Sequence, residues 1–127
     1  MSDNNPKSGT FCWHELVTKD AEACKKFYGA LFGWTFTEKE IRNTPHTIFH
    51  KDGQDLASMF QILPEWGDLS PHWMTYIAVD DVDAKAREAE ELGGSIVVPP
   101  TDIPTVGRAT VVLDPGGAAV AFIKINS

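Results

Sequence analysis

Residues 15–34 read ELVTKDAEACKKFYGALFGW, and a second copy of their pattern returns at residues 76–96 as YIAVDDVDAKAREAEELGGSI. Each copy predicts a strand, an acidic helix start, a helix, a glycine stop and a further strand, in that order. Aligning Asp20 with Asp81 gives an offset of 61 residues. At this offset three further pairs are identical: Ala23 with Ala84, Leu31 with Leu92, and Gly33 with Gly94. The chain is therefore predicted to be an internal duplication.

The length and composition predict a single globular domain. The chain has 127 residues, 43% hydrophobic and 23% charged, enough to bury a core without disulfides or a structural metal. The 18 acidic and 11 basic residues give a formal charge of −7, with no basic run to follow a phosphate backbone, so nucleic acid is not expected as a partner. No apolar run approaches the length of about 20 residues that spans a bilayer, and no signal-peptide pattern is present. We expect a cytoplasmic protein with a flexible tail at 1–10 and one domain at 11–127.

The first module, residues 11–63, is predicted to hold four strands and one helix. The helix is expected at 21–31, with Asp20 as its N-cap and Gly33 as its end. Its apolar residues at helical spacing are Ala23, Phe27, Tyr28 and Leu31. We expect this face of the helix to pack on the sheet. The strands are expected at 11–17, 34–41, 47–50 and 56–63, the last two joined by the turn Asp52-Gly53.

The second module repeats this order. Residues 64–71, PEWGDLSP, have the composition of a linker, so the second module is expected at 72–127. Its helix is expected at 82–92 and its strands at 73–79, 95–98, 109–113 and 119–125, with a long loop at 99–107. Each module is thus βαβββ, and the predicted fold class is α+β with a mixed eight-stranded sheet.

At this point the sequence resembles the vicinal oxygen chelate superfamily, which includes glyoxalase I, bleomycin-resistance proteins and extradiol dioxygenases. The motifs that carry the resemblance are FYGALFGW in the first module, and AVDDVDA, ELGG, VPPTDIPTVGR and DPGGAAVAF in the second. The resemblance implies paired βαβββ modules whose curved sheet carries helices outside and a concave ligand cleft inside.

The resemblance also implies where a metal would bind. In the metalloenzymes of this superfamily, a divalent cation is held by four cleft-facing residues, on the first and last strand of each module. The corresponding positions here are Trp13, Ser58, Met74 and Ala121. These side chains are not a ligand set for a hard or borderline cation. We therefore predict no metal and no other cofactor, with a divalent metal at other residues as the alternative.

Two polar residues are the candidate catalytic pair. Glu15 shares a strand face with Trp13, and Tyr76 stands at the equivalent place in the second module, so the two are expected to face each other. A carboxylate there is costly to desolvate unless it is paired or used. Glu15 is therefore either a ligand-binding or general-base residue, or a dimer contact or structural carboxylate, which the Tyr76 phenol could satisfy.

Other residues are candidates for the ligand site. Arg108 follows a loop that resembles a lid in this superfamily, and it either clamps an anion or forms a salt bridge at the rim. The expected apolar lining, which could equally be core, consists of Trp13, Met59, Trp73 and Met74. Neither a metal-ligand spacing of the histidines nor a nucleophile elbow is present.

Two functions remain open on the sequence. The first is a bleomycin-resistance-like protein that binds a small, partly apolar or aromatic molecule without metal. The alternative is a glyoxalase I-like lyase, isomerase or dioxygenase that depends on a divalent metal. A homodimer is expected, because a half-open sheet leaves apolar strand surface that a twofold partner would cover.

Overall fold

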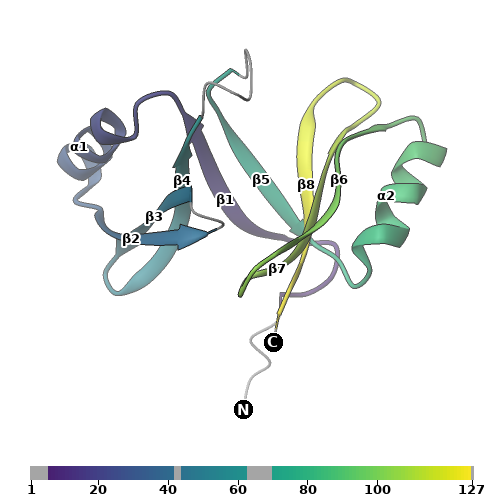
Figure 1. The fold of residues 1–127 in the computed structure, drawn as a ribbon, viewed down its shortest axis with the longest axis horizontal. Coiled ribbons are helices and arrows are strands. Elements are labelled where there is room, and N and C mark those ends of the chain that lie inside the picture. Colours follow the sequence, from purple (N-terminus) through teal and green to yellow (C-terminus); the bar gives the residue numbers. More distant parts are fainter. Residues whose placement is uncertain (1–5, 42–43, 63–69, 127) are drawn as a thin grey trace. The chain divides into compact units, whose positions relative to one another are not determined.

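The computed structural model describes residues 6–41, 44–62 and 70–126. Two βαβββ modules follow one another in the chain, as predicted (Figure 1). The first consists of β1 (Phe11–Thr18), α1 (Ala21–Phe32), β2 (Thr35–Ile41), β3 (Thr44–Lys51) and β4 (Gln54–Gln61). The second consists of β5 (His72–Ala78), α2 (Val82–Glu91), β6 (Ser95–Ile103), β7 (Gly107–Leu113) and β8 (Ala119–Ile125). The predicted linker falls largely outside the described residues.

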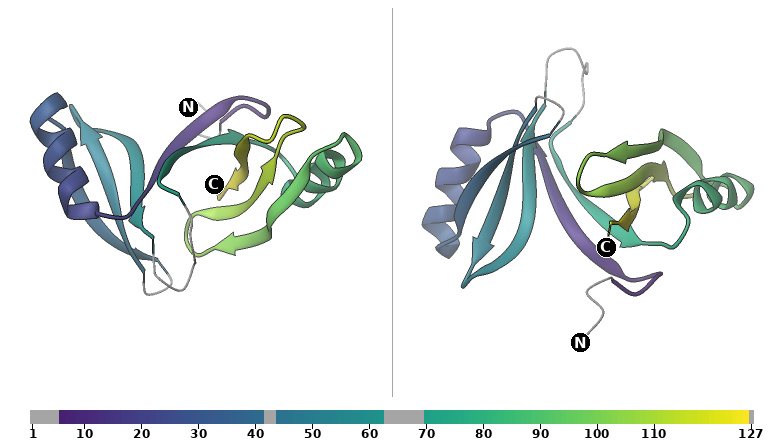
Figure 2. Two further views of the ribbon diagram at one scale, coloured as in Figure 1. Left: turned by 90° about the horizontal axis from the view of Figure 1, so that it is seen from above. Right: turned by 60° about the horizontal axis from the view of Figure 1, so that its bottom comes forward.

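The strands form a mixed sheet in the order β2-β3-β4-β1-β5-β8-β7-β6, which confirms the predicted fold class. By their internal contacts, the residues fall into an N-terminal unit, His14–Met74, and a C-terminal unit, Met1–Trp13 with Thr75–Ser127. In the N-terminal unit β1 pairs with β4 in parallel, and β5 pairs with β8 in the same way in the C-terminal unit. The remaining pairs within the two units are antiparallel. In each unit the helix covers one face of its strands (Figure 2).

Both helices begin at the predicted aspartates. The Asp20 carboxylate accepts a hydrogen bond from the Ala23 amide at 3.0 Å, and Asp81 accepts one from the Ala84 amide at the same distance. Gly33 ends α1 in the left-handed conformation, with φ of 71°, which glycine adopts without strain. The duplicated helix signals are therefore confirmed by the same capping chemistry in both modules.

The buried face of α1 differs from the predicted one. Ala23, Phe27 and Leu31 are exposed, whereas Lys25 is buried. The Lys25 ammonium bonds to Glu22 and Glu38, both at 2.8 Å, so its aliphatic stem can pack against the sheet. Tyr28 of the predicted face does pack on the core, and the buried Lys25 replaces the other predicted residues there, with its charge satisfied by the two carboxylates.

The core of the N-terminal unit lies between α1 and the sheet. Leu16, Phe49 and Met59 are its buried centre. The Tyr28 ring of α1 packs edge-on against Phe49, with centroids 6.0 Å apart, and stacks on Trp34 at 5.2 Å. Since neighbouring residues of a strand point to opposite faces, this packing determines which side chains face away from the helix.

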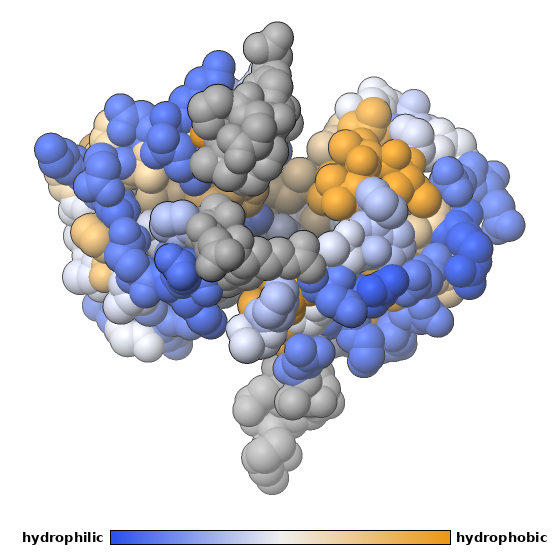
Figure 3. Space-filling model, viewed as in Figure 1, coloured by the Kyte–Doolittle hydropathy of each residue, from blue (hydrophilic) through white to orange (hydrophobic). Residues whose placement is uncertain are grey.

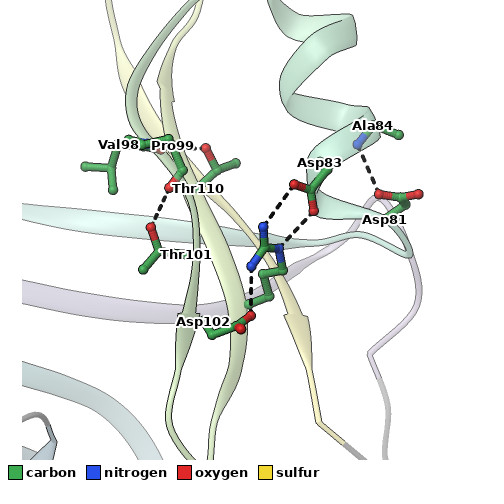
Figure 4. A network of polar contacts seen from close by, with 9 residues as sticks. Asp81, Asp83, Ala84, Val98, Pro99, Thr101, Asp102 and Thr110 are labelled. Carbon is green, nitrogen blue, oxygen red and sulfur yellow. Dashed lines mark hydrogen bonds and ion pairs between the residues drawn. The ribbon is translucent and has the colours of Figure 1, made fainter.

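The predicted long loop at 99–107 is wrong, because β6 continues to Ile103 and only a short turn separates it from β7. Pro99 and Pro100 lie within the strand. Proline is tolerated there because β6 is an edge strand, which has no hydrogen-bonded neighbour on one side. The irregular pairing around them is supported by hydroxyls: Thr110 donates to the Val98 carbonyl and Thr101 to the Pro99 carbonyl, both at 2.6 Å (Figure 4).

Part of the predicted tail is tied to β5. The Gly9 amide donates to the Ala78 carbonyl at 2.7 Å, and the Ala78 amide donates to the Thr10 carbonyl at 2.9 Å. These two bonds extend the C-terminal unit to residues that composition alone assigns to a flexible segment. Apolar surface remains exposed on this unit, where Figure 3 shows an orange area over β6 and β8 and where Val97 and Val98 are exposed.

Candidate functional site

A polar surface covers the face of the N-terminal unit that points away from α1. On β1, Leu16 packs in the core under the helix, so its neighbour Glu15 points to the other face. On β2, Glu38 reaches the Lys25 ammonium of α1, so Thr37 also points away from the helix. Strand register joins Glu15, Ser58, Ile48 and Thr37 in one row across β1, β4, β3 and β2. We call this surface of the four strands the polar face.

Glu15 and Ser58 are joined by a hydrogen bond on the polar face. The Ser58 hydroxyl donates to the Glu15 carboxylate at 2.9 Å, and the two residues are direct partners in the parallel pairing of β1 with β4. Glu15 is half-buried and Ser58 is buried. An oriented, partly desolvated carboxylate can accept hydrogen bonds from a ligand hydroxyl or amine, or take up a proton.

A second polar group on the same face was not predicted from the sequence. His50 Nδ1 lies 2.8 Å from the Asp55 carboxylate, and His50 Nε2 lies 2.9 Å from the Thr37 hydroxyl. The contact between His50 and Asp55 could have been predicted from the sequence, because a two-residue turn at Asp52-Gly53 makes these residues cross-strand partners. Thr37 lies one strand farther away and becomes a neighbour only through the register of β2 with β3.

The C-terminal unit holds the second half of the predicted site. Tyr76 and Ala121 are partners in the pairing of β5 with β8, as Glu15 and Ser58 are in the pairing of β1 with β4. The structure therefore places Ser58 and Ala121 at equivalent positions in the duplication. Glu15 and Tyr76 belong to different units, and their expected pairing stays a prediction.

The four positions that the resemblance to the metalloenzymes assigns to a metal do not offer a fitting donor set. Ala121 has no donor atom, and the Ser58 hydroxyl is engaged with Glu15. Trp13 and Met74 add an indole and a thioether, which do not suit a hard or borderline cation. Across 6–41, 44–62 and 70–126, no group of three or more His, Cys, Asp or Glu residues is placed to hold a metal ion.

Two residues of the expected apolar lining lie elsewhere. Met59 is fully buried in the core with Leu16 and Phe49, on the helix side of β4, because its neighbour Ser58 occupies the polar face. The Trp73 indole donates to the Tyr28 hydroxyl of α1 at 3.3 Å, which places it toward the helix. Its neighbour Met74 therefore points to the opposite face of β5.

Arg108 is engaged by two carboxylates. Its Nε and Nη2 bond to the Asp83 carboxylate at 2.8 and 3.0 Å, and its Nη1 bonds to Asp102 at 2.8 Å, as the dashed lines between these side chains in Figure 4 show. The bonds from Arg108 hold the pKa of Asp83 below its ordinary value. Of the two roles considered for Arg108, the contacts are those of the salt bridge, which ties α2 to β6 and β7.

A cavity of about 370 Å³ adjoins the Arg108 cluster in the C-terminal unit. Lys124 and Asn126 line it together with Arg108, and Lys124 is the direct cross-strand partner of Arg108. A second cavity of about 450 Å³ lies where Lys7 and Asp80 meet the end of β8. Neither cavity is lined by the predicted ligand residues of β1 or β4.

The sequence matches a known family of proteins. The sequence profile of the Glyoxalase/Bleomycin resistance protein/Dioxygenase superfamily matches residues 11–122, and the chain belongs to this superfamily. A glyoxylase candidate of Mycobacterium bovis, CFP32, is 36% identical over 94% of this chain and 47% of its own length. The anthracycline biosynthesis protein DnrV of Streptomyces peucetius is 35% identical over 93% of this chain and 42% of its own length. The chain thus spans about half the length of these curated relatives.

Solved structures show the same fold. Methylmalonyl-CoA epimerase from Mycobacterium tuberculosis superposes with a TM-score of 0.67 at 15% identity, over 100% of this chain and 94% of the other. The Streptomyces coelicolor methylmalonyl-CoA epimerase in complex with 2-nitronate-propionyl-CoA has a TM-score of 0.68 at 16% identity, over 94% of this chain and 100% of the other. At these identities the likeness concerns the fold alone. Within the described residues, no helix is long and apolar enough to cross a membrane.

Proposed function

We propose that the chain is a metal-independent binding protein for small, partly apolar or aromatic molecules. The observation that carries this proposal is the Glu15–Ser58 hydrogen bond of 2.9 Å at a position where the metalloenzymes of the superfamily hold a cation. A neutral hydroxyl paired with a carboxylate suits a hydrogen-bonding ligand better than a divalent ion. The ligand class is supported by relatives that are named as anthracycline biosynthesis proteins.

In this proposal the Glu15 carboxylate is the polar anchor of the ligand. The Ser58 hydroxyl donates to that carboxylate and orients it, and the carboxylate would accept a hydrogen bond from an ammonium or hydroxyl group of the ligand. Trp13 shares a strand face with Glu15 and would supply apolar contact. Tyr76 remains a predicted ligand residue of the second module, whereas Met74 and Ala121, which the sequence also predicts, are buried.

The test is binding of an amine-bearing anthracycline, measured by fluorescence quenching and by thermal shift. Hydrogen bonds to a charged group contribute about 1.5–3 kcal/mol, so Glu15→Gln should weaken binding by roughly 10- to 150-fold. Glu40→Gln is the control, because this exposed carboxylate shares the helix-facing side of β2 with Glu38. No saturable binding by the wild type, or equal affinity of the two variants, would contradict the proposal.

A second candidate is a divalent-metal lyase, isomerase or dioxygenase, which the 36% identity to a glyoxylase candidate favours. Such an enzyme would need ligands outside the four positions discussed above. Elemental analysis of the purified protein, followed by thermal shifts with Ni, Zn, Mn and Fe(II), separates the two candidates. Stoichiometric metal would overturn the metal-independent proposal, and its absence together with unchanged melting would remove the enzyme candidate.

We also propose a cytoplasmic homodimer. The exposed apolar side chains Phe27 and Leu31 on α1, and Val97 and Val98 on β6, are surface that a second copy would cover. Sedimentation equilibrium at micromolar concentration tests the dimer, and a strict monomer would contradict it.

A further inference from the structure

Three side chains from neighbouring strands form a hydrogen-bonded chain on the polar face. Asp55 lies at the start of β4, His50 near the end of β3 and Thr37 in the middle of β2. The distances are 2.8 Å from Asp55 to His50 Nδ1 and 2.9 Å from His50 Nε2 to the Thr37 hydroxyl. A hydroxyl, an imidazole and a carboxylate in this order are the parts of an activated nucleophile.

The direction of the hydrogen bonds follows from the chemistry of the three groups. An ionised carboxylate only accepts, so the His50 Nδ1 bonded to Asp55 carries the hydrogen. In the neutral imidazole, Nε2 then has the free lone pair, and it accepts the hydrogen of the Thr37 hydroxyl. Asp55 thereby selects the tautomer in which His50 can remove the Thr37 proton.

We propose that Thr37 is the nucleophile of an acyl-transfer site that acts on small activated esters. The Thr37 oxygen attacks the ester carbonyl while its proton passes to His50 Nε2, and the leaving alcohol or phenol departs with that proton. Water then attacks the acyl-threonine, His50 takes a proton from the water, and the proton returns to the threonine oxygen as the carboxylic acid leaves. Atoms and charges balance with ester and water as the only reactants.

The three residues are accessible to a small molecule from solvent. His50 is 24% exposed and Asp55 is 62% exposed, and the Thr37 side chain is open to solvent, so an ester reaches the hydroxyl directly. Lys39 occupies the next position on the same face of β2. The nucleophile Thr37 lies three strands from Glu15 in the sheet order, and Asp55 lies on β4, the strand next to β1.

The test uses p-nitrophenyl acetate as the substrate. The release of p-nitrophenol gives the reaction rate, and peptide mass mapping shows which residue carries the acetyl group. The test variants are Thr37→Val, His50→Gln and Asp55→Asn. Thr35→Val is the matched control, because it removes a hydroxyl from the other exposed threonine on this face of β2. Circular dichroism confirms that each variant is folded, and Thr37→Ser tests whether another hydroxyl restores the reaction.

A positioned general base contributes roughly 10²- to 10⁴-fold, so Thr37→Val and His50→Gln should lower the rate by about 100-fold or more. Asp55→Asn should lower it by at least about 10-fold through the loss of the correct tautomer. Thr35→Val should keep the wild-type rate, and acetyl should accumulate on the peptide that contains Thr37. Acetylation confined to lysines, or a wild-type rate in folded Thr37→Val, would overturn the proposal and leave the Glu15 ligand test unaffected.

Discussion

Replacing Phe49 by alanine should destabilise the N-terminal unit strongly. Phe49 is fully buried, and its ring packs 6.0 Å from the Tyr28 ring and 5.3 Å from the Trp34 ring, centroid to centroid. Large-to-small substitution of a buried Phe costs about 3–5 kcal/mol. With an unfolding entropy of about 2.1 cal/mol/K per residue, a loss of about 4 kcal/mol lowers Tm by roughly 15 °C.

The assay for Phe49→Ala is urea denaturation followed by tryptophan fluorescence, since Trp34 contacts the deleted ring. Phe11→Ala is the control, because Phe11 is 71% exposed and surface substitutions usually change stability by less than about 0.5 kcal/mol. A loss below about 1 kcal/mol for Phe49→Ala, or one equal to that of Phe11→Ala, would refute the assignment of the core to the helix side of β3.

Two further predictions concern the C-terminal unit. Arg108 holds the pKa of Asp83 below its ordinary value, so their contact stabilises the fold above that value, about 4, and the stabilisation is lost as pH falls through the lowered pKa. The difference in Tm between the wild type and Asp83→Asn should therefore be largest near neutral pH and should disappear once the pH is below the lowered pKa of Asp83, whereas a constant difference would contradict this. Ala121→Glu buries a carboxylate at a fully buried position and should cost several kcal/mol in urea denaturation, whereas Ala119→Glu, at an exposed position of β8, should be nearly neutral. Equal stability of these two glutamate variants would show that position 121 is accessible to water.

The duplication made most of the fold predictable. Cap residues and glycine stops are local signals, since Asp20 and Asp81 act on amides three residues away. The α1 face could not be predicted in the same way, because burial of Lys25 depends on Glu38, which lies in another element. A prediction from helical periodicity uses only the spacing of apolar residues, so it cannot include the Glu38 carboxylate that pairs with Lys25.

The candidate site also contains some features that the sequence predicts and others that depend on strand pairing. Laying one module on the other picks out Glu15 and Ser58 separately, whereas their contact is visible only in the strand register and the hydrogen bond between them. The exclusion of Met59 from the polar face follows from side-chain alternation, once the residue beside it is assigned. Thr37 joins His50 only through the pairing of β2 with β3, and no spacing in the sequence marks that contact.

The two prolines of β6 have a consequence for how copies of this protein can meet. Pro99 and Pro100 have no amide hydrogen, and β6 lies at the end of the strand order. A neighbouring chain therefore cannot extend the sheet along this stretch by continuing the hydrogen-bond ladder, although Val97 and Val98 offer it an apolar surface. A second copy that meets the protein at Pro99 and Pro100 would therefore be held by side-chain contacts and not by hydrogen bonds between strands.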